Sequence, residues 1–465
     1  MNERKQGLNI SVKSFLTAIL VIALLMVLTY GLSFLIPGGQ YARSLDESGN
    51  TVIDTTAGFT YVEGGLPFWQ WLLSPLLVLT AEGGGMILAI LVFLLVIGGV
   101  FNALQLCGLM NYMLDKIVDR FGSARYRLLA VITFFFMAMG AFIGSFEECV
   151  PLVPIVAALA VSLGWDTLTG LGMSLLAVGC GFASGVCNPF TVGVAQSLAG
   201  LPMFSGIWLR ALSFVLIYAL LLIFLLHHAK KVEHTELQKK KQFEAQKKMD
   251  QGLICFGSIV GVGILLVLSS SFIHALQDYT MIIVAVMFLI AGISASLTFG
   301  MRGKELASAF GKGMSGIFPA VLLILMASSI KYTLTEAKIL DTLLYWAVNS
   351  VSGLPKWSVI LCIYLIVLVL NFFISSGSAK AFLLMPLIVP MAQIFEIKAQ
   401  LCVLAFAFGD GFSNVFYPTN AALLISLGLA DISYGKWIKF SWKFQLLNLL
   451  LTSALLLFGL SVGYC

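Results

Sequence analysis

The hydrophobic pattern of the chain consists of long apolar runs separated by short polar segments. A run of about 20 apolar residues is long enough to cross a bilayer as a helix. Such runs predict spanning helices over 14–36, 85–107, 204–227, 252–272, 277–299, 313–331 and 441–463. The segments 168–198 and 399–428 have the length of a crossing but carry proline and polar residues at their centres, so we expect helices that are unwound in the middle. The pattern therefore predicts nine crossings.

Two further segments, 128–163 and 357–395, have a different pattern. Each consists of two apolar pieces, too short to cross on their own, around a polar centre that reads GSFEECVP in the first and SSGSAK in the second. Half-length apolar pieces with a polar turn are typical of a re-entrant hairpin. The predicted fold is therefore an all-α polytopic membrane protein with about nine transmembrane helices, two re-entrant hairpins and two broken helices.

Composition and charge agree with this class and predict an orientation. The chain is 60% hydrophobic and only 11% charged, with a mean hydropathy of +1.00, whereas soluble chains have about 25% charged residues. Lys and Arg gather in the segments 111–127, 228–250 and 300–305, and segment 38–66 is acidic. Basic loops face the cytoplasm, so these charges report topology rather than nucleic-acid binding. Nine crossings with a cytoplasmic N-terminus and a retained first helix put every loop on its expected side.

Matched positions in the two halves predict an internal repeat. At an offset of 229 residues, Pro189 meets Pro418, Trp208 meets Trp437 and Arg210 meets Lys439; at an offset of 232, Glu148 meets Lys380. The predicted organisation is a first repeat over 1–227, a basic cytoplasmic linker over 228–251, and an extra helix plus the second repeat over 252–465. The extra helix makes the two repeats inverted in the membrane, and breaks at corresponding places in inverted repeats indicate a transporter binding site.

The centre of the first hairpin carries two adjacent acids, Glu147 and Glu148. A charge at the bilayer centre costs roughly 2.5–3.5 kcal/mol on insertion scales, so acids at this depth generally have a function. The functional hypothesis is a site for a cation, a proton or a substrate amine. The structural alternative is that one carboxylate caps the helix that starts near Pro151.

The centre of the second hairpin carries Ser376, Ser378 and Lys380. Serine hydroxyls and free N–H groups at the start of a helix favour an anion, and an adjacent ammonium strengthens a carboxylate site. In the alternative, Lys380 snorkels or pairs with an internal acid such as Asp410. The residues leave both roles open.

The helix breaks at Pro189 and Pro418 supply a third group of candidates, because each proline removes a helical N–H and frees a carbonyl. The freed carbonyls and the side chains beside them are neutral oxygen ligands for a substrate or a cation. A Na⁺ ion at Asn188 or Asn420 is one candidate. Asp410 and Asn414 lie one turn apart before the second break, and they are candidates for a proton or Na⁺ site. The candidate side chains at the breaks are Asn188, Thr191, Asp410, Asn414, Thr419 and Asn420.

Motifs of other functional classes are missing from the sequence. It has no GxxxxGK[ST] loop, no HExxH pattern and no Cys or His spacing typical of a metal site. No nucleophile–base pair for an enzyme is visible. We therefore expect no cofactor and no enzymatic activity, and transport driven by exchange or by a Na⁺ or H⁺ gradient.

Five motifs carry a resemblance to a known family. They are IPGGQYAR (36–43), GSFEECVPLVPI (144–155), CNPFTVGVAQSLAGLPMFSGIWLR (187–210), NFFISSGSAKAFLLMPLIVPMAQ (371–393) and YPTNAALLISLG (417–428). The chain resembles the bacterial anaerobic C4-dicarboxylate carrier-like family of the ion-transporter superfamily, which includes basic amino-acid antiporters of the arginine/ornithine type. The resemblance implies a bacterial plasma-membrane protein with a scaffold part and a moving part, and elevator-type alternating access.

The expected function is secondary transport of a small metabolite that bears a carboxylate. Glu147, Glu148 and Asp410 outnumber Lys380, and this excess of acid favours an amino acid, especially a basic one. A C4-dicarboxylate carried with Na⁺ or H⁺ is the alternative, and a channel fits two opposed hairpins less well. The expected partners are the substrate and the bilayer, and a homodimer is compatible with the sequence.

Overall fold

A computed structural model describes residues 12–45, 51–53, 58–81, 84–144, 146–202, 204–233, 246–270, 280–350 and 353–465. Residues 1–11 and half of the predicted cytoplasmic linker 228–251, namely 234–245, lie outside the described residues. Long helices form at all seven predicted apolar runs: α1 (Val12–Leu35), α3 (Gly84–Leu106), α10 (Ile207–Val232), α11 (Lys247–Ser270), α13 (Thr280–Phe299), α14 (Gly303–Glu336) and α20 (Tyr434–Ser461).

Length and hydropathy show a multi-pass membrane protein. Within the described part of the chain, seven helical stretches are long and apolar enough to cross a membrane, or eight if the two segments of α14 count as one span. These two segments meet at an angle of 41°, and Pro319 lies at the bend, where it removes a backbone donor. The count of nine crossings and two re-entrant hairpins remains a prediction.

Two segments that we expected to be loops contain regular structure. Residues 111–127 include helix α4 (Leu109–Phe121), because Leu109, Met113, Ile117 and their apolar neighbours recur at helical spacing. Segment 38–66 contains four short strands, of which β1 (Gly39–Tyr41) pairs antiparallel with β4 (Phe59–Tyr61), and β2 (Arg43–Leu45) with β3 (Thr51–Ile53). The described chain is mostly helical, as predicted for an all-α membrane protein, and these short strands are an addition to it. Helices α2 (Phe68–Leu77) and α15 (Leu340–Asn349) lie nearby.

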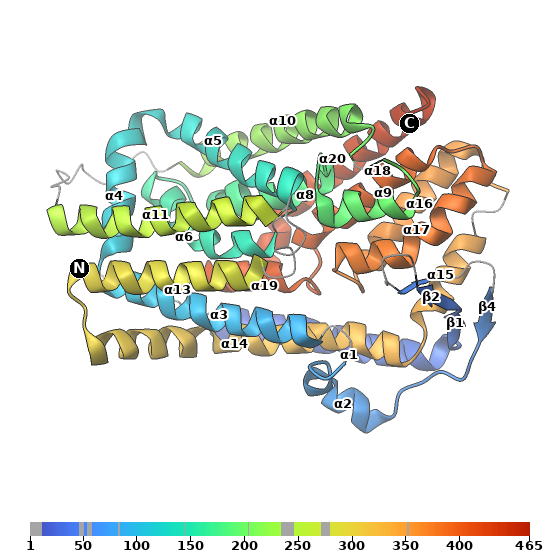
Figure 1. Cartoon of the computed structure of the whole chain (residues 1–465), viewed down its shortest axis with the longest axis horizontal. Helices are drawn as coiled ribbons and strands as arrows, with labels where there is room; N and C mark the ends of the chain where they lie inside the picture. Colours follow the sequence, from blue (N-terminus) through green and yellow to red (C-terminus); the bar gives the residue numbers. More distant parts are fainter. Residues whose placement is uncertain are drawn as a thin grey trace.

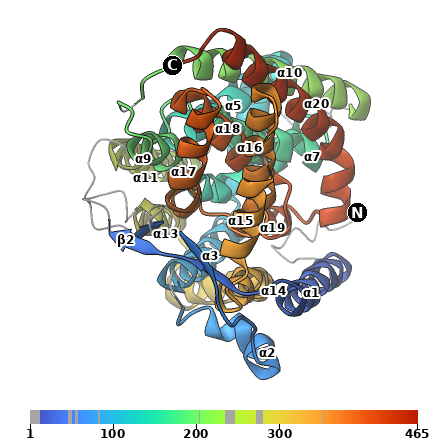
Figure 2. The same ribbon diagram turned by 90° about the vertical axis from the view of Figure 1, so that its right-hand side faces the viewer.

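The helices divide into two groups (Figure 1). In the first group α3 packs on α13 and α14, and α1 packs on α14. The second group contains α10, α20, the two hairpins and the two broken helices. Figure 2 shows α16, α17, α18 and α20 together on one side, with α1, α2, α3 and α14 on the other.

Both predicted hairpins reverse the direction of the chain. The first runs through α5 (Arg125–Ala138), a π-helical turn (Met139–Ile143), a 3-10 segment (Glu147–Leu152) and α6 (Val153–Ser162), and the second consists of α16 (Lys356–Asn371) and α17 (Gly377–Ile394). In each, the start of the first arm meets the end of the second: Arg125 donates to the carbonyl of Leu163 at 3.2 Å, and Lys356 pairs with Glu396. That the hairpins turn back inside the bilayer remains a prediction.

Each of the two predicted broken helices is interrupted in the structure. The first broken helix consists of α7 (Thr167–Leu171), a π-helical turn (Gly172–Leu176) and α8 (Ala177–Ser184), and it resumes as a π-helical turn (Pro189–Gly193) and α9 (Val194–Leu198). Gly185, at φ +49°, ends α8 in the left-handed conformation that glycine favours. The second consists of α18 (Ala399–Gly411), a 3-10 segment (Phe412–Val415) and α19 (Ala421–Leu429).

Contacts between helices occur in matching pairs when the elements of the first half are exchanged with those of the second. The pair α1–α14 corresponds to the pair α13–α3, and the contact of α17 with α9 corresponds to that of the 3-10 segment Glu147–Leu152 with α19. At the centre α8 packs against α18. An inverted repeat requires pairs of this kind, although the repeat itself remains a prediction.

Gly411 is expected to tolerate no side chain. A Cβ atom there would lie 2.1 Å from Cα of Ala183, so the substitution Gly411→Ala has to push α8 and α18 apart. We expect a destabilisation of about 1–3 kcal/mol, as for overpacked cores, measured by unfolding of the purified protein. Gly435→Ala is the control, because a Cβ at Gly435 meets nothing within 4 Å. Equal stability of the two variants would contradict the close packing.

Candidate functional site

A buried ion pair joins the second hairpin to the second broken helix. Nζ of Lys380, in the first turn of α17, lies 2.5 Å from Oδ1 of Asp410, near the end of α18, and both side chains are 0% exposed. Of the two roles that the sequence left open for Lys380, the structure shows the internal pair. The two charges neutralise each other, which is how charged side chains are generally accommodated at membrane depth.

Asn371, the last residue of α16, connects this ion pair to the second break, and sequence reasoning missed it. Its Oδ1 accepts a hydrogen bond from Lys380, and its Nδ2 lies within hydrogen-bond distance of the Asp410 carbonyl oxygen (3.0 Å), Ser413 Oγ (2.6 Å) and Asn414 Oδ1 (3.0 Å). Asn420 donates to the same Asn414 oxygen at 3.2 Å. The predicted residues Lys380, Asp410, Asn414 and Asn420 therefore belong to one buried network.

The two candidate asparagines at the breaks cap the helices that follow. Asn188 Oδ1 accepts from the backbone N–H of Phe190 (2.9 Å) and of Thr191 (3.3 Å), and Asn420 Oδ1 accepts from Leu423 N–H (3.2 Å). These bonds satisfy donors that a helix start leaves free. A Na⁺ ion at either break remains a prediction. No group of three or more His, Cys, Asp or Glu that could hold a metal ion occurs within the described ranges.

The first break and the second hairpin meet at Gly377, the first residue of α17. A Cβ there would lie 2.5 Å from Cγ2 of Thr191 and 2.8 Å from Oδ2 of Asp410, so only glycine fits. The polar atoms Thr191 Oγ1, Asn188 Nδ2 and Asp410 Oδ2 are buried and have no hydrogen-bond partner among the described residues. Ser376 caps α17, with Oγ 3.5 Å from Ala379 N, and Ser378 follows in the first turn. The start of α17 thus lies against the side chain of Thr191 and a carboxylate oxygen of Asp410.

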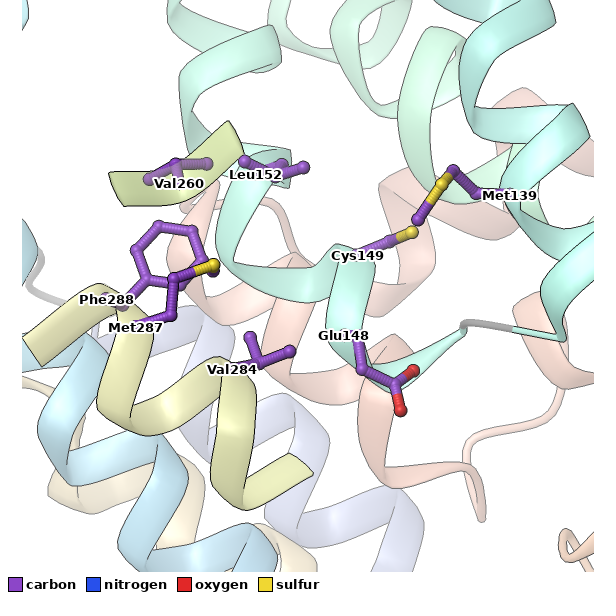
Figure 3. Close-up of a pocket in the computed structure, with 8 residues that line it drawn as sticks. All are labelled: Met139, Glu148, Cys149, Leu152, Val260, Val284, Met287 and Phe288. Atoms are coloured by element: carbon purple, nitrogen blue, oxygen red, sulfur yellow. The ribbon is translucent and has the colours of Figure 1, made fainter. Parts of the chain in front are cut away.

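The tip of the first hairpin carries the two predicted acids. Glu147 and Glu148 begin the 3-10 segment that packs against α19. Glu148 lines a cavity of about 20 Å³, enough for one water molecule, whose wall is otherwise apolar. Figure 3 shows Glu148 with Cys149 and Leu152 on one side, and Val284, Met287 and Phe288 of α13 on the other. Thr419 Oγ1, at the second break, is buried without a partner in the described chain.

The carbonyl groups that the two breaks free accept hydrogen bonds from side chains that do not match at the offset of 229 residues. Val186 and Val415 are 229 residues apart. The carbonyl of Val186 accepts from Nε of Arg210 (3.2 Å), and that of Val415 accepts from Nε1 of Trp437 (2.7 Å). The repeat counterpart of Trp437, Trp208, is 48% exposed. Buried Arg210 therefore has a structural role at the first break.

Comparisons with known proteins agree with a transporter. The model of the C4-dicarboxylate anaerobic carrier (DcuC) family matches residues 15–461. The chain is 30% identical over 403 residues to the Escherichia coli (strain K12) protein named "Putative basic amino acid antiporter YfcC", covering 82% of this chain and 79% of that protein.

Two solved structures are similar at lower identity. The YdaH transporter of Alcanivorax borkumensis is 18% identical with a TM-score of 0.45, covering 97% of this chain and 99% of that one. MtrF of Neisseria gonorrhoeae, from a class of antimetabolite efflux pumps, is 18% identical with a TM-score of 0.44, covering 94% of each chain. Because the family model matches nearly the whole chain, this multi-pass membrane protein belongs to the C4-dicarboxylate anaerobic carrier family and is a transporter.

Proposed function

We propose that the protein is a secondary transporter, an antiporter or an ion-coupled symporter, of a small carboxylate-bearing metabolite, and that the substrate is a basic amino acid. The observation that carries this proposal is the meeting of the second hairpin with the first helix break at Gly377, where buried polar groups have no partner among the described residues. In this proposal the hairpins and broken helices move as a unit against α1, α3, α13 and α14, in an elevator-type cycle.

The junction at Gly377 suits a carboxylate. Gly377 begins α17, and the positive end of a helix attracts anions. Thr191, from the first break, adds a hydroxyl without a partner in the described chain. A substrate carboxylate would satisfy groups that are otherwise costly to bury.

The charges of the remaining site residues suit an amine. Lys380 and Asp410 neutralise each other, so the tip of the first hairpin contributes two further acids, Glu147 and Glu148, to the region. Opposite charge in a low-dielectric site attracts a cation strongly. An amino acid with a cationic side chain therefore complements both ends of the region.

A Na⁺- or H⁺-coupled C4-dicarboxylate carrier is the second candidate, and the description of the family favours it. In that case cations accompany the substrate and neutralise Glu147 and Glu148. The two opposed hairpins that the sequence predicts fit either carrier better than a channel, which needs a continuous pore.

Thermal unfolding of the purified protein separates the two candidates, because a ligand that binds only the native state stabilises it. We expect lysine, ornithine or arginine to raise the unfolding temperature, and their decarboxylated analogues and C4-dicarboxylates to have little effect. Stabilisation by dicarboxylates alone, with or without Na⁺, would favour the second candidate. Counterflow in proteoliposomes then distinguishes exchange from ion-coupled uptake.

Substitution of Thr191 by valine tests the carboxylate end. A hydrogen bond to a charged group contributes about 1.5–3 kcal/mol, so we expect Thr191→Val to weaken substrate binding by roughly 10–100-fold. Thr133→Val is the matched control, because the buried Thr133 hydroxyl donates to the Leu129 carbonyl within its own helix (2.8 Å). Unchanged affinity in Thr191→Val would argue against a carboxylate at this junction.

A further inference from the structure

A buried polar stripe runs along α20, on the far side of the second broken helix from Lys380. It consists of Ser441, Gln445, Asn448 and Thr452, which recur at spacings of four, three and four residues and so share one helix face. All four side chains are buried. The basic residues of this part of α20, Lys439 and Lys443, are exposed.

The ends of this stripe are hydrogen-bonded, but three polar atoms in its middle have no partner among the described residues. The Ser441 hydroxyl donates to the Trp437 carbonyl (2.9 Å), and Thr452 Oγ1 lies 2.7 Å from the hydroxyl of Tyr364 in α16. Between them, both side-chain atoms of Asn448, Oδ1 and Nδ2, and the Oε1 oxygen of Gln445 have no hydrogen-bond partner among the described residues. Asn448 is 0% exposed and Gln445 is 6% exposed. Polar atoms buried in this way destabilise the protein unless a ligand satisfies them.

The stripe faces the negative end of a helix. Gln445 Nε2 approaches the carbonyl of Phe412 at 3.4 Å, and Phe412 begins the 3-10 segment that ends α18. The last carbonyls of a helix carry the equivalent of about half a negative charge, and such helix ends near a break attract monovalent cations in transporters. Two of the three unpartnered atoms are acceptors, which also favours a cation.

We propose that Gln445 and Asn448 of α20, with the carbonyl of Phe412 at the end of α18, form a binding site for Na⁺. The ligands are neutral oxygens, whereas sites for Ca²⁺ and Mg²⁺ use carboxylates. Tyr364, which bonds Thr452 at one end of the stripe, packs against the rings of Phe408 and Phe412. None of these ligands belongs to the substrate junction at Gly377, so the proposal does not depend on the substrate proposed above.

The corresponding helix of the first half has no such stripe. The buried face of α10 after Ser213 consists of Phe214, Ile217, Leu221, Leu225 and Ala229. The inferred cation site is therefore present once in the described chain, at the second broken helix, and it could couple that helix to the Na⁺ gradient.

The test is thermal unfolding of the purified full-length protein in detergent without substrate. NaCl is titrated against KCl and choline chloride at constant ionic strength. We expect a saturable rise in the unfolding temperature with Na⁺ only. Asn448→Leu, which replaces the amide by an apolar group of similar size, is expected to keep its stability in choline chloride and to need at least about ten-fold more Na⁺ for the same rise.

Two further variants make the test decisive. Gln445→Leu is expected to weaken the Na⁺ response in the same way, and it decides the matter if Asn448→Leu does not fold. Ser441→Ala is the matched control and should respond to Na⁺ like the unmodified protein, because its hydroxyl is bonded within its own helix. An equal response to Na⁺ and K⁺, or an unchanged Na⁺ response in Asn448→Leu or Gln445→Leu, would overturn the proposal and leave a site for water only. Since no substrate is added, the outcome is independent of the substrate proposed above.

Discussion

Replacing Lys380 by methionine is expected to destabilise the protein by about 3–5 kcal/mol, the cost of leaving one buried charge without its partner. The reason is the complete burial of the pair, because Asp410 has no access to water that could replace the ammonium. Asn371 also loses its contact with Nζ. Chemical unfolding of the purified protein in micelles measures the change.

Two controls separate the buried charge from the loss of side-chain packing. In Lys380→Met/Asp410→Asn both charges are absent, so most of the lost stability should return; a double variant as unstable as the single one would contradict the explanation. Lys356→Met removes the ion pair with Glu396 at the base of the same hairpin, where the side chains are 50% and 80% exposed. Exposed pairs contribute little, so Lys356→Met should unfold like the unmodified protein.

Glu148→Gln is expected to reduce uptake in proteoliposomes to the rate of empty vesicles while the protein remains folded. Glutamine keeps the size of the side chain and removes its negative charge. At the tip of the first hairpin that charge is proposed to hold a cation, either the amine of the substrate or a coupling ion. Uptake of labelled substrate, together with the unfolding temperature, measures the two effects separately.

The matched controls for Glu148→Gln are the neighbouring acid and a distant one. Glu147→Gln shows whether one or both carboxylates of the tip are needed. Glu305→Gln changes an exposed acid in the first turn of α14, far along the chain from either hairpin, and should transport normally. Normal uptake by Glu148→Gln would refute its role.

The sequence predicted the features of the fold that have a local cause. Apolar runs determined the long helices, and Pro189 and Pro418, with their polar neighbours, marked both breaks. The turn of each hairpin was visible because glycine, serine and charge interrupt apolar sequence. The short strands at 39–61 were missed because three-residue strands leave little periodic pattern, and α4 was missed because its basic residues suggested a loop.

The site was predicted less completely, because its contacts are distant in sequence. Asn371 follows a long apolar run and nothing beside it indicates a function; its partners Asp410, Ser413 and Asn414 come 39–43 residues later. Likewise, no local signal showed that Lys380 pairs with Asp410 or that Asn188 and Asn420 cap helices. Asn448 and Gln445 are recognisable only once α20 is placed against α18, since a lone amide in a spanning helix is not unusual.

The strands at 39–61 impose an order on the assembly of the chain. Tyr41 N–H donates to Asp341 at 2.9 Å, and Arg43 binds the same carboxylate through two bonds of 2.9 and 3.0 Å. Asp341 is 298 residues after Arg43, so at typical rates of translation it is made roughly 15–60 s later. During this interval the strands have no partner in α15. The contact can close only after much of the second half has been synthesised, and protection of Arg43 from modification in nascent chains would report when the two halves of the protein come together.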